Sequence, residues 1–189
     1  PDGQPYIVQP DPFTLQENPL YGLHFTDQYN RRSRFLGSLT VRYSPINWFS
    51  LEGNASLDRS DRYTDGYTPK GFKALDGTPG VGSVDKANAF TQAFNANVTA
   101  SFLQRFGDLT ARTRFQYLVE SEREEERSAS GNTLSVFGVP RVNVARNRTG
   151  ASEIEEVRSA GFFAITGLDY RGKYVADALV RRDGSSLFR

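Results

Sequence analysis

The residue types that most often do chemistry in proteins are nearly absent from this sequence. It contains no cysteine and a single histidine, His24, among 189 residues. Without cysteine there is no disulfide, no thiol nucleophile and no cysteine-ligated metal. A histidine-based metal site or catalytic triad would depend on His24 alone, which has no ligand-competent neighbour at a suitable spacing. No nucleophile–base pair and no cofactor fingerprint is present, so we expect a protein that is not an enzyme and holds no cofactor.

Two segments resemble ligand-binding motifs but lack residues that the chemistry requires. Asp58, Asp61 and Asp65 suggest a calcium loop, yet their spacing and the missing bidentate glutamate do not fit an EF-hand. The glycine-rich run 77–82 has no Lys-Ser or Lys-Thr pair and no following helix pattern, so it is not a phosphate loop. The sequence therefore predicts no metal site and no nucleotide site.

Charge and hydropathy exclude further classes of protein. Lys+Arg 23 and Asp+Glu 22 almost cancel, whereas nucleic-acid-binding proteins usually show a clear basic excess. No stretch approaches the roughly 18 apolar residues of a membrane-spanning helix. That exclusion covers helices alone, because a membrane β-strand needs only about 9–11 residues of alternating character and leaves little trace in mean hydropathy.

Alternating polar and apolar residues predict long β-strands. Between residues 34 and 44, and again between 48 and 60, apolar or small side chains occupy the odd positions and mostly polar ones the even positions. A period of two over this length indicates a strand, and a helix cannot produce it. The pattern returns in residues 90–102, 109–119, 162–170 and 174–182. Within 162–170, Phe163 and Ile165 interrupt the alternation.

The connections between these strands are alternately long and short. Long loops at one end and tight turns at the other are typical of an outer-membrane β-barrel, whose tight turns are periplasmic. Aromatic residues gather beside the short turns, as in the girdle at a membrane interface. The short turns lie near Pro45, Gly107 and Gly172, and the neighbouring aromatics are Tyr43, Trp48, Phe49, Phe102, Phe106, Tyr170 and Tyr174.

Two arginines indicate which strand face meets water. Arg112 and Arg114 lie mid-strand, and an arginine on the lipid face of a barrel costs roughly 2–4 kcal/mol at the bilayer centre. Their face should therefore line a wet lumen, either as a substrate-contacting surface or simply as a hydrated, charge-compensated wall. The residues predicted to line the lumen are Glu52, Asn54, Asp58, Arg112, Arg114 and Glu120.

Two other architectures share part of this pattern. A soluble secreted β-sandwich, acting as a carbohydrate-binding or adhesin module, also alternates, but strands usually run about 5–6 residues and several here are longer. A small closed barrel would pair its first and last strands. We predict instead that strand 35–43 does not pair with strand 174–182.

The end of the chain resembles a known family. Tyr170-Arg-Gly-Lys-Tyr174, followed by Arg181-Arg-Asp-Gly-Ser-Ser-Leu-Phe188, is similar to the Y-x-G-K-Y…R-R-D-G-S-S-x-F stretch of SusC/RagA-type TonB-linked outer-membrane proteins. Asn18-Pro-Leu-Tyr21, Asn47-Trp-Phe-Ser-Leu51 and Phe106-Gly-Asp-Leu-Thr resemble further elements of that family, in the same order.

This resemblance implies an all-β fold, in which an antiparallel meander of about six long strands forms part of a transmembrane barrel of about 22 strands. The plug domain, the TonB-contacting segment and the closing strand would lie outside this chain. The implied organisation is an initial extracellular loop at 1–30, a hairpin at 31–60, an extracellular loop at 61–86, a hairpin at 87–120, an extracellular loop at 121–158 and a hairpin at 159–189.

The resemblance also implies a function. The chain would be a segment of a TonB-dependent importer of oligosaccharides or peptides in the outer membrane of a Gram-negative cell. Its partners would be outer-membrane lipid, a SusD-like surface lipoprotein and the TonB complex, reached through other parts of the protein, and no nucleic acid. Aromatics of the long loops could hold substrate or could simply pack the loops together. These candidates are Tyr21, Tyr63, Tyr67, Phe72 and Phe137.

Overall fold

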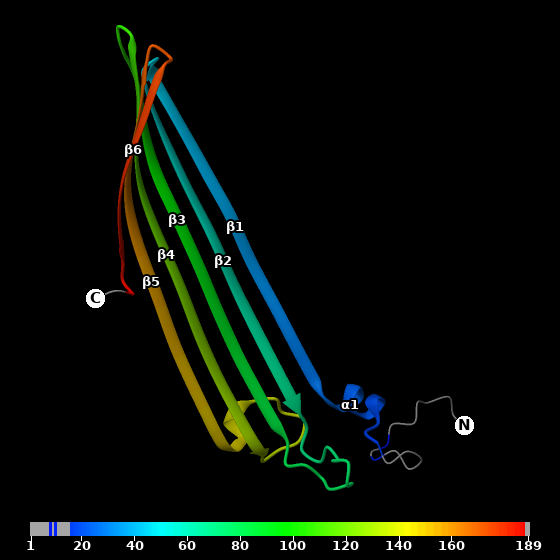
Figure 1. Ribbon diagram of the computed structural model, residues 1–189. Helices are drawn as coiled ribbons and strands as arrows, with labels where there is room; N and C mark the ends of the chain where they lie inside the picture. The colour runs from blue at the N-terminus through cyan, green and yellow to red at the C-terminus, as the bar shows by residue number, and fades with distance from the viewer. Residues whose placement is uncertain (1–7, 9, 11–15, 188–189) are drawn as a thin grey trace. The chain divides into compact units, whose positions relative to one another are not determined.

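The computed structural model describes residues 8, 10 and 16–187 (Figure 1). Much of the predicted initial loop (residues 1–7, 9 and 11–15) and Phe188 of the family-like motif lie outside the described residues. The prediction of an all-β meander of six long strands is confirmed. The elements are α1 (Pro19–Phe25), β1 (Asp27–Ile46), β2 (Phe49–Thr68), β3 (Ser83–Phe106), β4 (Leu109–Leu134), the 3₁₀ turn η1 (Val142–Val144), β5 (Ala145–Tyr170) and β6 (Tyr174–Ser185).

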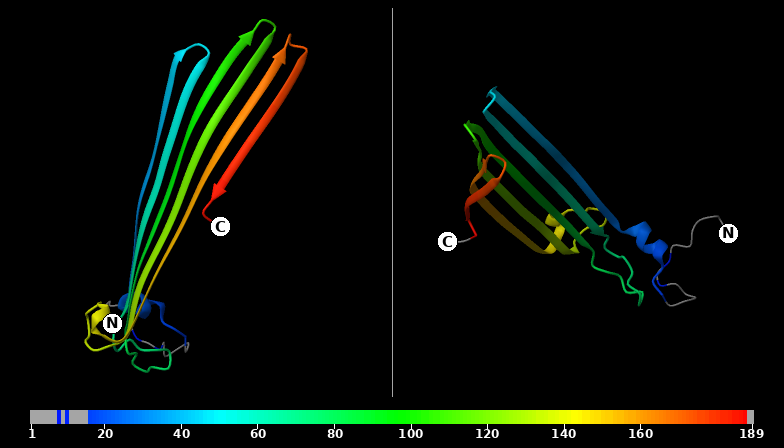
Figure 2. Two further views of the ribbon diagram at one scale, coloured as in Figure 1. Left: turned by 90° about the vertical axis from the view of Figure 1, so that its left-hand side faces the viewer. Right: turned by 45° about the horizontal axis from the view of Figure 1, so that its top comes forward.

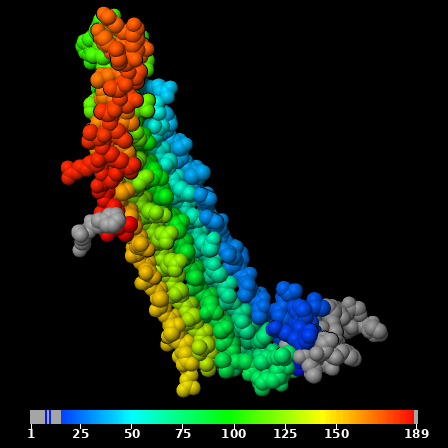
Figure 3. All heavy atoms as spheres, in the orientation of Figure 1, coloured from blue at the N-terminus to red at the C-terminus, as the bar shows by residue number. Residues whose placement is uncertain are grey.

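The strands form one sheet in chain order, β1-β2-β3-β4-β5-β6. Consecutive strands lie side by side in the ribbon and in the space-filling view (Figures 1 and 3). The last pair is antiparallel, and its register places Phe163 opposite Arg181 and Gly167 opposite Asp177. Within the described sheet β1 and β6 are the two edges, so the first and last strands do not pair, as predicted.

The chain divides into two compact units, each built from parts of several strands. The loop unit contains α1 and the ends of β1–β5 next to the long connections. The turn unit contains the strand segments next to the three short turns, which Figure 2 shows as tight hairpin ends. The loop unit is Pro1–Ser33, Asp61–Phe90 and Glu125–Ile154, and the turn unit is Arg34–Ser60, Thr91–Glu124 and Glu155–Arg189.

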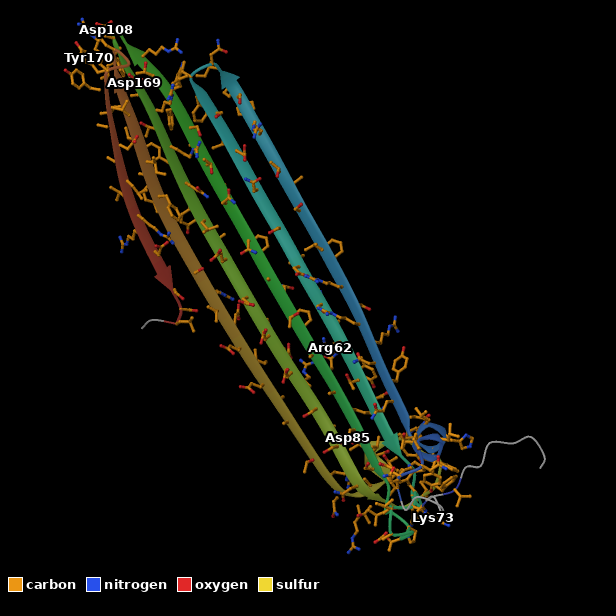
Figure 4. All side chains as sticks on the ribbon, turned by 45° about the vertical axis from the view of Figure 1, so that its right-hand side comes forward. Arg62, Lys73, Asp85, Asp108, Asp169 and Tyr170 are labelled. Atoms are coloured by element: carbon orange, nitrogen blue, oxygen red, sulfur yellow. The ribbon has the colours of Figure 1, made fainter. Side chains whose placement is uncertain are left out.

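In the turn unit, two adjacent turns are tied together by Arg171. Its backbone N–H donates to the carbonyl of Asp108 at 2.9 Å, and its Nε donates to the Asp108 carboxylate at 2.7 Å. Arg171 has a φ of 54°, in the left-handed region that non-glycine residues rarely adopt. Asp108, Asp169 and Tyr170 gather at this end (Figure 4). The tie to Asp108 compensates for the strained backbone of Arg171.

The long connections are shorter than the sequence analysis predicted. β2 continues to Thr68 and β3 starts at Ser83, so 69–82 is irregular rather than 61–86. In the same way, β4 and β5 leave only 135–144 without strand structure, rather than 121–158. These strand extensions carry polar residues on both faces, so they show no hydrophobic alternation even though their backbones pair.

A short helix lies inside the segment predicted as the initial loop. Asn18 caps α1, because its side-chain oxygen accepts a hydrogen bond from the N–H of Leu20 at 3.1 Å. Pro19 follows in the first turn, where its missing N–H has no consequence. The loop assignment was therefore wrong for Pro19–Phe25, because seven residues are too few to produce a helical period.

Few hydrophobic side chains are buried among the described residues. They are Tyr21, Val84, Leu134 and Ala145, and the last three form a small cluster in the loop unit. In the turn unit, Phe94 and Phe115 keep 37% and 40% of their surface exposed. A β-sandwich would bury such strand residues against a second sheet. The described single sheet has no second layer, so the sandwich alternative is wrong.

Candidate functional site

The turn unit presents one apolar face and one polar face. On the apolar face, four phenylalanines from β2, β3, β4 and β5 form a row across the sheet. Their ring centroids are 5.1 Å apart for Phe49 and Phe102, 6.0 Å for Phe102 and Phe115, and 6.4 Å for Phe115 and Phe162. Aromatic pairs at 4.5–7 Å attract one another. The row therefore joins neighbouring strands through side chains that remain partly exposed.

The polar face carries charged pairs that cross from β1 to β2. Arg34 donates from Nε to Asp58 at 2.9 Å, and Arg42 donates from Nε to Glu52 at 2.9 Å. Asn54 lies between these pairs and donates to Asn97 of β3 at 3.2 Å. Exposed ion pairs of this kind contribute little to stability. Their main effect is to compensate charge along the wall.

Arg112 and Arg114 lie on the same polar face and line a hollow of about 760 Å³ in the turn unit. Gly167, Asp169 and Asp177 also line it. Among the described residues neither arginine forms an ion pair, unlike Arg34 and Arg42. Exposed guanidinium groups beside carboxylates of this kind are stable at a hydrated surface.

The polar face also explains why the alternation fails on β5. Phe163 lies opposite Arg181 of β6, whose guanidinium carbon is 4.6 Å from the centre of the phenylalanine ring. Arg181 pairs in addition with Asp183. A cation over the ring covers an aromatic side chain on an otherwise polar face.

Glu120 is held on β4 by the Ser159 hydroxyl, which donates to its carboxylate at 2.9 Å.

The loop unit contains a second hollow, of about 300 Å³, which we call the loop pocket. The Tyr21 ring of α1 is only 7% exposed and lies 4.7 Å from the Phe25 ring and 4.9 Å from the Phe72 ring. Phe137 approaches from the connection between β4 and β5, and Lys70 and Lys73 complete the polar part of the lining. Figure 4 places Lys73 at this end of the strands.

Hydrogen bonds hold the parts of the loop pocket in place. The N–H of Lys73 donates to the Tyr21 hydroxyl at 2.8 Å, and the N–H of Gly80 donates to the Phe72 carbonyl at 2.7 Å. A Cβ on Gly80 would lie only 2.9 Å from that carbonyl oxygen, so the close approach requires glycine. In the same connection, hydrogen bonds from the Thr78 hydroxyl and N–H hold the pKa of Asp76 below its usual value.

The structure brings together three of the five loop aromatics that the sequence indicated. Tyr21, Phe72 and Phe137 line the loop pocket, whereas Tyr63 and Tyr67 do not and lie in strand β2 rather than in a loop. The Tyr67 hydroxyl accepts from the N–H of Gly138 at 3.0 Å and so positions the residue next to Phe137. Sequence reasoning missed Phe25, Lys70 and Lys73. The interleaved run Lys70-Gly-Phe-Lys73 was the signal that could have found the two lysines.

The aspartates considered for calcium are engaged with nitrogen donors. Asp58 pairs with Arg34, Asp61 accepts from Asn88 at 2.7 Å and Asp65 accepts from Lys86 at 2.8 Å. Across residues 8, 10 and 16–187, no group of three or more His, Asp or Glu side chains is placed to hold a metal ion. Within the same residues, no helix has the length and apolar character needed to cross a membrane.

Comparison with known proteins gives one sequence relative and several structural ones. No family model matches the chain. The TonB-dependent receptor P26 of Formosa agariphila is 26% identical over 181 residues, which are 90% of this chain and 18% of that receptor. The chain thus spans less than a fifth of its curated relative.

Solved structures show the same arrangement of strands. The RagAB peptide transporter matches with a TM-score of 0.77 and 14% identity, over 90% of this chain and 19% of the matched chain. The RagAB peptide importer in its open-open state matches with a TM-score of 0.74 over 89% of this chain and 19% of the other. With the family-like motif at β5 and β6, these matches show a chain that has the strand arrangement of part of the RagAB barrel and is similar in sequence to a TonB-dependent receptor.

Proposed function

We propose that this chain supplies part of the barrel wall and of the extracellular loops of a nutrient importer in the outer membrane of a Gram-negative cell. The observation that best supports this proposal is that the turn unit has one apolar face and one polar face. The row Phe49–Phe102–Phe115–Phe162 lies on one face, and the pairs Arg34–Asp58 and Arg42–Glu52 lie on the other. A membrane barrel needs lipid on its outer face and water within its bore. The apolar row would meet acyl chains, and the charged pairs would line the lumen.

The polar residues then acquire defined places in the transport path. Glu52, Asn54, Asp58, Arg112, Arg114 and Glu120 would form the hydrated lumen wall. Arg112 and Arg114 share their hollow with Asp169 and Asp177, so the wall near the short turns carries charges of both signs. The chain itself would break no bond and hold no cofactor. It would contribute a polar, charged surface along the path that cargo takes through the lumen.

The cargo would be an oligosaccharide or a peptide too large for passive diffusion, captured by the loops together with a SusD-like surface lipoprotein. The relatives support this because two of them are described as a TonB-dependent receptor and as a peptide transporter. Tyr21, Phe72 and Phe137 converge on one hollow and are the best-supported contacts for cargo. Tyr63 and Tyr67 lie in β2 and do not line this hollow. Energy would come from the TonB complex, which other parts of the protein would contact.

Dependence on TonB tests the proposal. Cells with the full-length protein would be given radiolabelled casein peptides and radiolabelled maltodextrins in separate assays. Uptake would be compared with uptake in cells lacking the protein and in cells lacking TonB. We expect uptake of at least one probe to fall to the same background in both deletion strains. Uptake that persists without TonB, or that never depends on this protein, would contradict the proposed function.

A further inference from the structure

The loop pocket combines aromatic rings with two lysines that have no anionic partner. Tyr21, Phe25, Phe72 and Phe137 line a hollow of about 300 Å³ together with Lys70 and Lys73. Among the described residues, neither lysine side chain makes an ion pair or a hydrogen bond. Lys86 of the same unit, by contrast, pairs with Asp65. The described lining of the pocket therefore combines apolar surface with two lysines that have no described anionic partner.

The chemistry of the lining separates two kinds of cargo. A sugar ring carries hydroxyls on most of its edges, and proteins usually engage them with carboxylate, amide or guanidinium groups. None of the described lining residues is Asp, Glu, Asn, Gln or Arg. The Tyr21 ring is tilted by 48° to that of Phe25 and by 44° to that of Phe72. These rings form the walls of a cleft rather than a flat platform on which a sugar could stack.

An apolar side chain with a carboxylate close by fits this lining better. The rings would remove the apolar group from water, which is the main favourable contribution in pockets of this kind. The ammonium groups of Lys70 and Lys73 would pair with the carboxylate. The hydrogen bond from the Lys73 N–H to Tyr21 fixes the backbone that carries this lysine beside the ring cluster. The pocket is thus largely formed before cargo arrives.

We propose that the loop pocket binds peptide cargo at an apolar residue that neighbours a carboxylate. This inference rests on the proposed import function and narrows its cargo to acidic peptides with apolar side chains. Lys70 and Lys73 would select charge, and Phe72 and Phe137 would hold the apolar side chain. Exposed ion pairs are weak and screened by salt, so the selection is expected to be modest and to decline as salt rises.

Binding of two matched peptides to outer membranes containing the full-length protein tests this. The probes are acetylated, amidated Ala-Ala-Leu-Glu-Leu-Ala-Ala and its glutamine analogue. We expect the glutamate peptide to bind about 3- to 10-fold more tightly at low salt, as two weak ion pairs allow. The double variant Lys70→Gln with Lys73→Gln should abolish the preference. Lys173→Gln removes the same charge from the turn between β5 and β6 and should leave the preference unchanged.

A second variant tests the apolar part. Phe137 is 72% exposed, so Phe137→Ala should not disturb folding, yet it should weaken binding of both peptides. Equal binding of the two peptides by the unaltered protein, or binding of neither, would overturn the inference. Tight binding of maltoheptaose that Phe137→Ala weakens would overturn the peptide assignment. The importer proposal is tested by the separate assay of TonB-dependent uptake. The peptide-binding results therefore neither support nor contradict it.

Discussion

At the scale of single residues, the account depends on which side of a strand each side chain occupies. Ala55 and Ser56 are neighbours on β2, but Ala55 belongs to the apolar face, whereas Ser56 lies between Asn54 and Asp58 on the polar face. The two positions are only about 3.3 Å apart along the strand and differ mainly in the direction of their side chains. They therefore form a matched pair for testing the lipid and lumen assignments.

Ala55→Arg should destabilise the full-length protein by about 2–4 kcal/mol if the position lies near the centre of the bilayer, because the guanidinium would face acyl chains. Ser56→Arg should change stability by less than about 1 kcal/mol, since the side chain enters a hydrated, charged surface. Urea unfolding in lipid vesicles measures both. Equal losses for the two variants would show that the faces do not meet different solvents.

At the scale of elements, the short turns are fixed by contacts between hairpins as well as by their own sequence. Gly172 supplies a φ of 66°, which glycine adopts freely. Arg171 before it has no such freedom, and it is held by Asp108 of the preceding hairpin. The register of β5 and β6 therefore depends partly on a side chain of another turn.

Arg171→Val should be the most damaging change in this turn. A β-branched residue at a φ of 54° costs about 1–2 kcal/mol, and the ion pair to Asp108 is lost as well. Arg171→Gly relieves the backbone and should stay within about 1 kcal/mol of the unaltered protein. Lys173→Val, where φ is not positive, serves as the control and should have little effect. Urea midpoints in vesicles that rank the three otherwise would contradict the role assigned to Arg171.

The sequence predicted these elements best where a strand has one apolar face and one polar face. Apolar residues alternate along 34–44 and 48–60 because each strand there has a distinct apolar face and polar face. The outer ends of β4 and β5 could not be predicted in this way, since water would meet both faces and no periodicity remains. Helix α1 was missed although Asn18-Pro19 is a helix-start signal, because seven residues show no period.

The candidate site was predictable in part for a similar reason. Their aromatic side chains made Tyr21, Phe72 and Phe137 candidates from the sequence. Their convergence on one pocket depends on how α1 and the connections 69–82 and 135–144 fold. No periodic pattern encodes how such connections meet. The weak alternation at Phe163 has its explanation in Arg181, a partner on the next strand that the sequence of β5 alone does not contain.

At the scale of the whole molecule, the six strands form an open sheet whose edges are β1 and β6. Unpaired strand edges readily pair with other chains. A sheet of this kind with few buried hydrophobic residues is understandable as one part of a larger barrel wall, where neighbouring strands pair with both edges and lipid covers the apolar face. The central claim is therefore that lipid and water meet opposite faces of the same strands.

A spin-label scan along β4, in a version of the full-length protein without other cysteines, tests this claim most directly. One cysteine at a time would replace residues 112–119, and the accessibility of each label to oxygen and to a water-soluble nickel chelate would be measured in lipid vesicles. The account predicts a period of two, with high oxygen accessibility at Thr113, Phe115, Tyr117 and Val119 and low accessibility at Arg112, Arg114 and Gln116. A scan without that period, or with oxygen accessibility highest at the arginine positions, would contradict it.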